Sequence, residues 1–285
     1  SYKLQGFEFE HPSDSLFVTH AANSCNIGVL THKGSALVID SGRTPFDSAS
    51  LAGFITTDLG LKIAALFNTH NHADHTFGNQ SFKCPVISSE SCLRTMEKNL
   101  TTYWTFDQIT RMVKETPSLA PKWKNLDISF PTVTFKDEML FDLNGLSVHF
   151  IHLGGHTACS SIAFDPVHKI LFSGDLVLGD RYPYLDEDGD PGIFLEALKR
   201  IVSFDPVLIV PGHGKCCDIA MVKKMIEYYT CLQGECRRFV DTHLSIDKVQ
   251  EVLVNCCGIT GIPRDHRRHR INIASVLAHL RKRQD

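Results

Sequence analysis

Four side chains that can bind a metal ion lie within six positions of the stretch NTHNHADHTFGN, residues 68–79: His70, His72, Asp74 and His75. Imidazole nitrogens and carboxylate oxygens are the usual protein ligands of zinc and of catalytic iron. In extended backbone the i, i+2 pair His70 and His72 would point to one side, and a turn after it would give Asp74 and His75 another heading. One loop could therefore serve two metal ions.

Three further candidate ligands each lie beside a glycine at the end of a predicted strand. They are His156 in HLGGHTACSS, Asp175 in LFSGDLVLGD and His213 in VLIVPGHGKC. Glycine next to a ligand lets backbone and substrate approach closely. Because a carboxylate can bridge two cations, Asp175 is the natural bridging ligand. The apolar run KIAALFN leads directly into the first cluster, which places that cluster at the C-terminal end of a strand, where open α/β sheets commonly bind ligands.

The elements that must position these residues are short strands followed by helices. Seven β-branched or aromatic runs bounded by turn residues predict strands: SLFVTH, SALVID, KIAALFN, TVTF, SVHFIHL, KILFSG and VLIV. Asn144-Gly145 predicts a tight hairpin and Asp165-Pro166 a second turn. Asp190-Pro191 predicts a helix N-terminus, and the pattern is helical almost throughout from Asp218. A strand-then-helix block that occurs roughly twice suggests two packed sheets with helices outside.

Composition limits the classes of protein. The chain has 285 residues, 43% hydrophobic, and a formal net charge of −3, so the global charge does not favour a nucleic-acid partner. No apolar run reaches the ~20 residues of a membrane-spanning helix, and no signal peptide is visible. The ten cysteines include no C-x-x-C pair. We interpret them as small buried hydrophobes, which predicts a cytoplasmic location.

Taken together, the motifs resemble those of the metallo-β-lactamase superfamily. The His-x-His-x-Asp-His cluster is followed in order by Gly-x-His, Ser-Gly-Asp and Pro-Gly-His-Gly, and the resemblance covers roughly residues 15–220. It implies an α+β fold, a four-layer αβ/βα sandwich with C-terminal helices. We expect a metallo-β-lactamase-like domain over residues 1–220 and a helical extension over 221–285. The early LVIDSG resembles the family's first motif, whose aspartate, here Asp40, would support the metal loop from behind.

The resemblance also implies a ligand set. The first metal would be held by His70, His72 and His156, the second by Asp74, His75 and His213, with Asp175 bridging. The cofactors would be two divalent ions, with zinc the leading choice and iron or manganese as alternatives. Such ions lower the pKa of a shared water from ~16 toward ~7 and so supply hydroxide at neutral pH. Asp74 would be the catalytic residue that orients this nucleophile and passes on a proton. Cys159, three residues after His156, is interpreted as packing.

The leading hypothesis for function is a metal-dependent hydrolase acting on an ester-like carbonyl, whether a lactone, a thioester or a β-lactam. The partner would be a small-molecule substrate, with a homodimer left open and neither membrane nor nucleic acid expected. Two other reactions remain open: persulfide dioxygenase chemistry at a single iron held by His70, His156 and Asp175, and phosphodiester or RNA hydrolysis. A member that only binds is disfavoured because all seven ligand types are present.

Three segments permit two interpretations each. Residues 100–128, rich in aromatic side chains, are either a helix and loop over a pocket or a surface helix anchored by those aromatics. Residues 184–192, with Asp186, Asp188 and Asp190, fit a solvated loop better than a calcium loop; Tyr182 and Tyr184 either contact substrate or pack at the loop base. Residues 264–270, RDHRRHR, fit a helix start with solvated arginines better than a nucleic-acid site.

Overall fold

The computed structural model describes residue 4 and residues 7–20, 23–185 and 189–282. The chain forms two compact units. The N-terminal unit comprises Ser1–His152 and Ser161–Val167, and the C-terminal unit comprises Leu153–Ser160 and His168–Asp285. Each unit carries part of the predicted ligand set, so each is described by itself.

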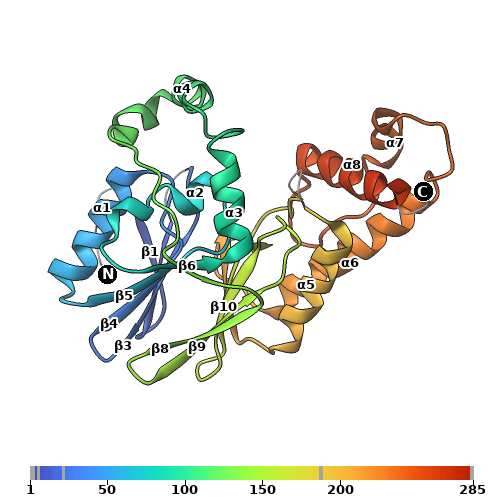
Figure 1. Cartoon of the computed structure of the whole chain (residues 1–285). Coiled ribbons are helices and arrows are strands. Elements are labelled where there is room, and N and C mark those ends of the chain that lie inside the picture. Colours follow the sequence, from blue (N-terminus) through green and yellow to red (C-terminus); the bar gives the residue numbers. More distant parts are fainter. Residues whose placement is uncertain (1–3, 5–6, 21–22, 186–188, 283–285) are drawn as a thin grey trace. The chain divides into compact units, whose positions relative to one another are not determined.

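The N-terminal unit contains ten strands and several short helices among the described residues (Figure 1). Its elements are β1 (Glu8–Ser13), β2 (Leu16–His20), β3 (Ile27–His32), β4 (Ser35–Ile39), α1 (Pro45–Gly53), the π-helix η1 (Phe54–Asp58), β5 (Lys62–Phe67), α2 (Ala73–Thr76), the 3-10 helix η2 (Asn79–Ser81), β6 (Val86–Ser89), α3 (Glu90–Asn99), α4 (Phe106–Glu115), the 3-10 helix η3 (Pro117–Trp123), β7 (Val133–Phe135), β8 (Glu138–Leu143), β9 (Leu146–His152) and β10 (Ser161–Asp165).

Strands β1 to β7 form one mixed sheet in sequence order. Strands β1 to β4 pair antiparallel, whereas β4, β5, β6 and β7 are parallel. The C-terminal ends of β4 and β5 therefore meet at the same edge of the sheet. This places Asp40, which follows β4, beside the His-rich loop that follows β5.

Strands β8, β9 and β10 form an antiparallel meander within the same unit. The predicted turn Asn144-Gly145 joins β8 to β9, and both residues have positive φ, 52° and 96°, as a two-residue hairpin requires. The meander contacts the large sheet through Phe150 of β9 and Phe67 of β5, whose rings stack with centroids 4.2 Å apart. Because both rings are fully buried, this stack fixes the strand that leads into the His-rich loop.

The C-terminal unit combines a parallel strand pair with four helices. Its elements are β11 (Ile170–Leu178), α5 (Pro191–Ser203), β12 (Leu208–His213), α6 (Ile219–Arg237), α7 (Ile246–Leu253) and α8 (His266–Lys282). As predicted, Asp190 caps α5: its Oδ1 accepts from the backbone N–H groups of Gly192 and Ile193 at 2.8 and 2.9 Å. Asp186 and Asp188 lie outside the described residues. None of the helices in the described part of the chain is long and apolar enough to cross a membrane.

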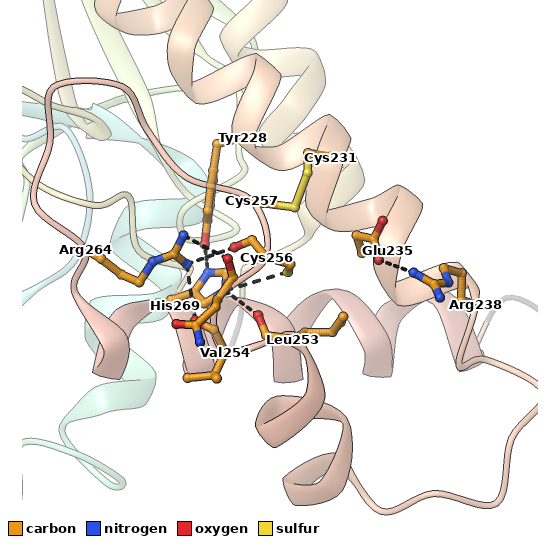
Figure 2. Close-up of a disulfide and its surroundings, with 11 residues drawn as sticks. Tyr228, Cys231, Glu235, Arg238, Leu253, Val254, Cys256, Cys257, Arg264 and His269 are labelled. Atoms are coloured by element: carbon orange, nitrogen blue, oxygen red, sulfur yellow. Dashed lines mark hydrogen bonds and ion pairs between the residues drawn. A yellow bond between two sulfur atoms is a disulfide. The ribbon is translucent and has the colours of Figure 1, made fainter.

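The interpretation of every cysteine as a buried hydrophobe is wrong for two of them. Cys231 of α6 and Cys257, in the loop between α7 and α8, form a disulfide (Figure 2). The other eight cysteines are outside the disulfide, and Cys159 is fully buried, in keeping with its predicted packing role. The disulfide joins α6 to the segment that leads into α8, so it restrains the C-terminal helices.

The expectation of solvated arginines at residues 264–270 is also wrong in part. Arg264 donates to the carbonyl oxygens of Val254 and Cys256, at 3.3 and 2.8 Å, and so closes the loop before α8 (Figure 2). Arg268 donates to the carbonyl of Tyr182 at 2.8 Å. Carbonyl groups at loop ends need donors, and guanidinium supplies several at once, which is the physical reason these two side chains turn inward.

Candidate metal centre

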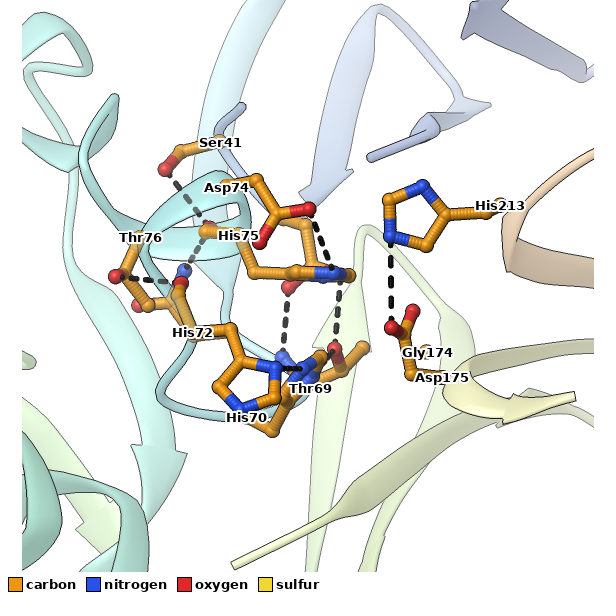
Figure 3. Close-up of polar contacts among 12 residues, drawn as sticks. Ser41, Thr69, His70, His72, Asp74, His75, Thr76, Gly174, Asp175 and His213 are labelled. Carbon is orange, nitrogen blue, oxygen red and sulfur yellow. Dashed lines mark hydrogen bonds and ion pairs between the residues drawn. The ribbon is translucent and has the colours of Figure 1, made fainter. Parts of the chain in front are cut away.

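The His-rich loop of the N-terminal unit brings two imidazole rings edge to face. The centroids of His70 and His72 are 4.6 Å apart, and Nε2 of His70 lies 3.0 Å from Nδ1 of His72 (Figure 3). Both side chains therefore point to one side, as their i, i+2 spacing predicts. Nδ1 of His70 lies 3.1 Å from Oγ1 of Thr69, which orients the ring from the opposite edge.

Asp74 and His75 lie on the short helix α2, and their side chains point in another direction from those of His70 and His72. His75 is fully buried, and its Nδ1 lies 2.7 Å from Oδ2 of Asp40. A carboxylate can only accept, so Nδ1–H of His75 donates this hydrogen bond and Nε2 carries the lone pair. Nε2 lies 3.9 Å from Oδ2 of Asp74 (Figure 3). A candidate donor nitrogen and a candidate donor oxygen are thus near neighbours.

Asp40 supports this loop, as the sequence motif predicts. Its carboxylate accepts from the backbone N–H and from the hydroxyl of Thr69, both at 2.8 Å, in addition to the contact with His75. Asp40 itself has φ of +60°, a conformation that non-glycine residues rarely adopt. The backbone turn after β4 therefore aims one buried carboxylate at three groups of the metal loop. Thr69 was not among the predicted site residues, and its place directly before His70 was the available signal.

A further residue behind the loop, Cys25, was not predicted from the sequence. Its thiol forms a group with Asp40 and His75 in which the candidate ligand atoms lie within 4.8 Å of one another. Burial raises the pKa of the Cys25 thiol to about 11, so the protonated form dominates at neutral pH. No spacing pattern in the sequence connects Cys25 to the histidine cluster.

The C-terminal unit places the other three predicted ligands around one carboxylate. Oδ2 of Asp175 lies 3.4 Å from Nε2 of His213, the last residue of β12 (Figure 3). The same oxygen lies 3.7 Å from Nε2 of His156. Asp175 lies within β11 and not at its end as predicted, and the parallel pairing, with Gly174 opposite Pro211, brings it near the end of β12. A carboxylate with an imidazole nitrogen on each side is the arrangement that a bridging ligand needs.

Glycine provides the room for this carboxylate. A Cβ at Gly212, on the neighbouring strand, would collide with Oδ1 of Asp175. The glycine of the Pro-Gly-His-Gly motif is therefore required by close approach, as predicted for glycines beside ligands.

His156 is oriented by backbone and not by a carboxylate. Its Nδ1 lies 2.7 Å from the carbonyl oxygen of Tyr184 and must donate to it, which leaves Nε2 as the acceptor facing Asp175. The segment that carries this carbonyl is held by α8: Asn272 donates to the carbonyl of Pro183 at 3.0 Å and accepts from the N–H of Leu185 at 3.2 Å. Asn272 is fully buried.

The two tyrosines before this site have different roles. Tyr182 is buried and packs edge-on against Tyr228 of α6 at 5.3 Å, so it packs at the loop base, one of the two alternatives open from sequence. The ring of Tyr184 lies 5.9 Å from that of His156.

The types of donor atom found in both units are those that bind divalent cations. Each unit gathers imidazole nitrogens and carboxylate oxygens, and His75 and His156 have their second nitrogen occupied by a hydrogen-bond acceptor of the protein. Such outer partners are typical of metal-binding histidines. The chain therefore contains His and Asp clusters able to hold metal ions.

A family match explains these features. The sequence profile of the metallo-beta-lactamase superfamily matches residues 21–213, so the chain belongs to that superfamily. The expectations of this family and of a hydrolase are confirmed.

Curated relatives are distant but cover much of the chain. An acyl-coenzyme A thioesterase, MBLAC2, of Gallus gallus is 26% identical, and the match covers 76% of this chain and 82% of the thioesterase. A beta-lactamase-like protein 2 homolog of Drosophila melanogaster is 26% identical, and the match covers 72% of this chain and 66% of that homolog.

Solved structures agree on the fold. A metallo-beta-lactamase from Pontibacter korlensis has a TM-score of 0.63 at 21% identity and covers 79% of this chain and 99% of its own. A metallo-beta-lactamase from Erythrobacter litoralis has a TM-score of 0.60 at 13% identity, with coverages of 80% and 98%. The predicted α+β class, an αβ/βα sandwich with C-terminal helices, is confirmed. The division of the chain after residue 220 stays a prediction.

Proposed function

We propose that this protein hydrolyses the thioester bond of a small acyl substrate with two divalent metal ions. The observation that carries the proposal is the construction of the two donor clusters, in which the protein holds Nδ1 of His75 and of His156, while Nε2 of each ring lies near an aspartate, Asp74 and Asp175 respectively. The proposed ligands are His70, His72 and His156 for the first ion, Asp74, His75 and His213 for the second, and Asp175 as the bridge.

The residues of the chain would perform separable tasks. When bound, the two ions would polarise the carbonyl of the substrate and acidify a water molecule. Asp74 would orient that water and take its proton, since this carboxylate is partly exposed whereas His70 and His75 of the same loop are buried. Asp40 and the carbonyl of Tyr184 would hold the imidazoles in the tautomer that ligation needs.

A thioester is favoured among the ester-like carbonyls because a relative that covers 76% of this chain is named an acyl-coenzyme A thioesterase. Fold and metal ligands alone do not select a substrate. Zinc as the metal, a small molecule as the partner and the cytoplasm as the location are parts of the same proposal.

Metal analysis and a substrate panel test the proposal together. The purified chain should contain two metal ions, and its hydrolysis of an acyl thioester should be lost with a chelator and restored by zinc. Lactone, β-lactam and phosphodiester substrates serve as the comparison set. One iron per chain with oxygen uptake would instead establish dioxygenase chemistry, and a full metal complement without turnover on any substrate would refute a hydrolase.

A further inference from the structure

A cavity of about 410 Å³ lies directly against the metal loop of the N-terminal unit. Its volume is in the range of small-molecule sites. All of its lining residues belong to the N-terminal unit and are described: Arg43, His72, Ala73, Asp74, Tyr103, Trp104, Gln108 and Met112. The aromatic segment 100–128 is therefore a cover over a pocket, and two of the proposed ligands form the pocket's inner end.

The base of this cover is fixed to the core. Trp104 is buried and packs edge-on against Phe77 at 5.1 Å, and Trp123 packs on the same ring at 6.0 Å. Trp123 also donates from Nε1 to the carbonyl of Arg43 at 2.9 Å. The anchored-helix alternative therefore holds for these two tryptophans. Contacts within the protein therefore hold both tryptophans in place.

The outer part of the cover is apolar and exposed. Leu100, Tyr103 and Phe106 are 43%, 61% and 83% exposed, although they lie within seven residues. Helix α4 has no fully buried residue. Of these three side chains Tyr103 lines the cavity, so it offers a surface at the pocket that an apolar ligand can cover.

The inner part of the cavity is polar. Nη1 of Arg43 donates to the carbonyl of Asn23 at 3.2 Å, and Nε has no hydrogen-bond partner in the described part of the chain. Guanidinium has five donor hydrogens, so this side chain can still donate to a ligand oxygen. His72 and Asp74 complete the polar end.

We infer that this cavity binds the acyl group of the substrate. The carbonyl end lies at the metal loop and the hydrocarbon chain runs past Trp104 and Met112 to Tyr103. The polarity of an acyl group changes along its length as that of the cavity does. It has an oxygen acceptor at one end and apolar methylene groups beyond it. Methionine and aromatic side chains adapt well to a flexible chain. This inference rests on the proposed function for the identity of the bond that is cleaved.

Binding can be measured without catalysis. The chain has two tryptophans, and Trp104 lines the cavity while Trp123 shares its base. Titration with dodecanoate should therefore change the intrinsic fluorescence of the protein. In the double variant Tyr103→Ser/Met112→Ser, which truncates two side chains that line the cavity, the dissociation constant should rise roughly tenfold, the loss expected when about two methylenes are no longer buried.

Turnover gives the second readout. Dodecanoyl and acetyl thioesters are compared by the ratio of their kcat/KM values, which should fall roughly tenfold in the double variant. Phe46→Ser is the matched control, because Phe46 is 62% exposed in the same unit and does not line the cavity. Both readouts should stay at wild-type values in this control.

The outcomes separate the two proposals. An unchanged ratio and an unchanged dodecanoate affinity in the double variant would overturn the inference while leaving hydrolysis intact. Dodecanoate binding that weakens in the double variant, in a protein that cleaves no thioester, would support the cavity assignment and refute the proposed reaction. A fall in both readouts of similar size in Phe46→Ser would also overturn the inference.

Discussion

The two donor clusters of this protein are built by different means. In the N-terminal unit four candidate ligands come from one loop, and a single buried carboxylate, Asp40, fixes that loop through Thr69 and His75. In the C-terminal unit three candidate ligands come from separate segments, and the group that orients His156 is a backbone carbonyl. A local cluster needs one strong support, whereas a dispersed cluster depends on the packing of elements far along the chain.

The largest effect on activity is expected at Asp74, the residue of the His-rich loop proposed to transfer a proton as well as to bind a metal ion. Asp74→Ala should lower kcat on a thioester by at least ~100-fold, because a positioned proton-transfer group is lost. Thermal unfolding should change little, since the Asp74 side chain is partly exposed. Asp218→Ala, which removes a carboxylate at the N-terminus of α6, is a control for general changes in charge. A turnover close to wild type in Asp74→Ala would contradict its assigned role.

The next largest effect is expected at Asp40, the carboxylate that orients His75 of the N-terminal cluster. Asp40→Asn keeps the size of the side chain but replaces one oxygen by a donor, which cannot accept from His75. Metal affinity, measured by competition with a chromogenic chelator, should fall by ~10- to 100-fold, as for other partners of metal-binding histidines. The loss should concern the ion assigned to His75 more than the other. Equal affinity in variant and wild type would show that Asp40 does not set the tautomer.

The same contrast explains what could be predicted from sequence. The spacing within residues 68–79 indicates four candidate ligands, and the glycines beside His156, Asp175 and His213 indicate three more, although Asp175 lies within β11 and not at its end as predicted. Four of the candidates lie in one loop of the N-terminal unit and three lie in the C-terminal unit. Cys25 and Asn272 carry no pattern, because a hydrogen bond to a neighbouring segment leaves no periodic signal.

The predictions for the cysteines and for the arginines of residues 264–270 failed for a related reason. Composition indicates only how cysteines behave on average, whereas the pairing of Cys231 with Cys257 depends on how α6 meets the loop before α8. Likewise the charge run at residues 264–270 predicts solvent contact, but Arg264 and Arg268 meet carbonyl groups that only the fold supplies. Contacts between distant segments decide both cases.

Asn272 provides the corresponding test of the C-terminal brace. Asn272→Ala removes two hydrogen bonds to the segment whose carbonyl orients His156, so metal affinity should fall by several-fold to ~10-fold. Val276→Ala is the control: it truncates a fully buried side chain of the same helix that does not contact this segment through hydrogen bonds.

A double-mutant cycle makes the test specific. In a His156→Ala background the effect of Asn272→Ala on metal affinity should disappear, because the ligand it positions is gone. Its effect on the free energy of unfolding should remain. Additive losses of metal affinity would show that Asn272 acts through general stability alone.

The disulfide should have the smallest effect on the metal centre and a clear effect on stability. Cys231→Ser opens a link that spans 26 residues, which corresponds to about 3 to 4 kcal/mol of unfolding free energy in the chain-entropy description. Urea unfolding should show this loss, and a reducing agent should produce the same loss in the wild type but none in the variant. Cys216→Ser, which removes a cysteine outside the disulfide, should leave the unfolding curve unchanged. Metal affinity should change less than in Asn272→Ala, because Asn272 itself makes the hydrogen bonds to Pro183 and Leu185. A larger loss of metal affinity in Cys231→Ser than in Asn272→Ala would mean that the disulfide, and not Asn272, carries the support to His156.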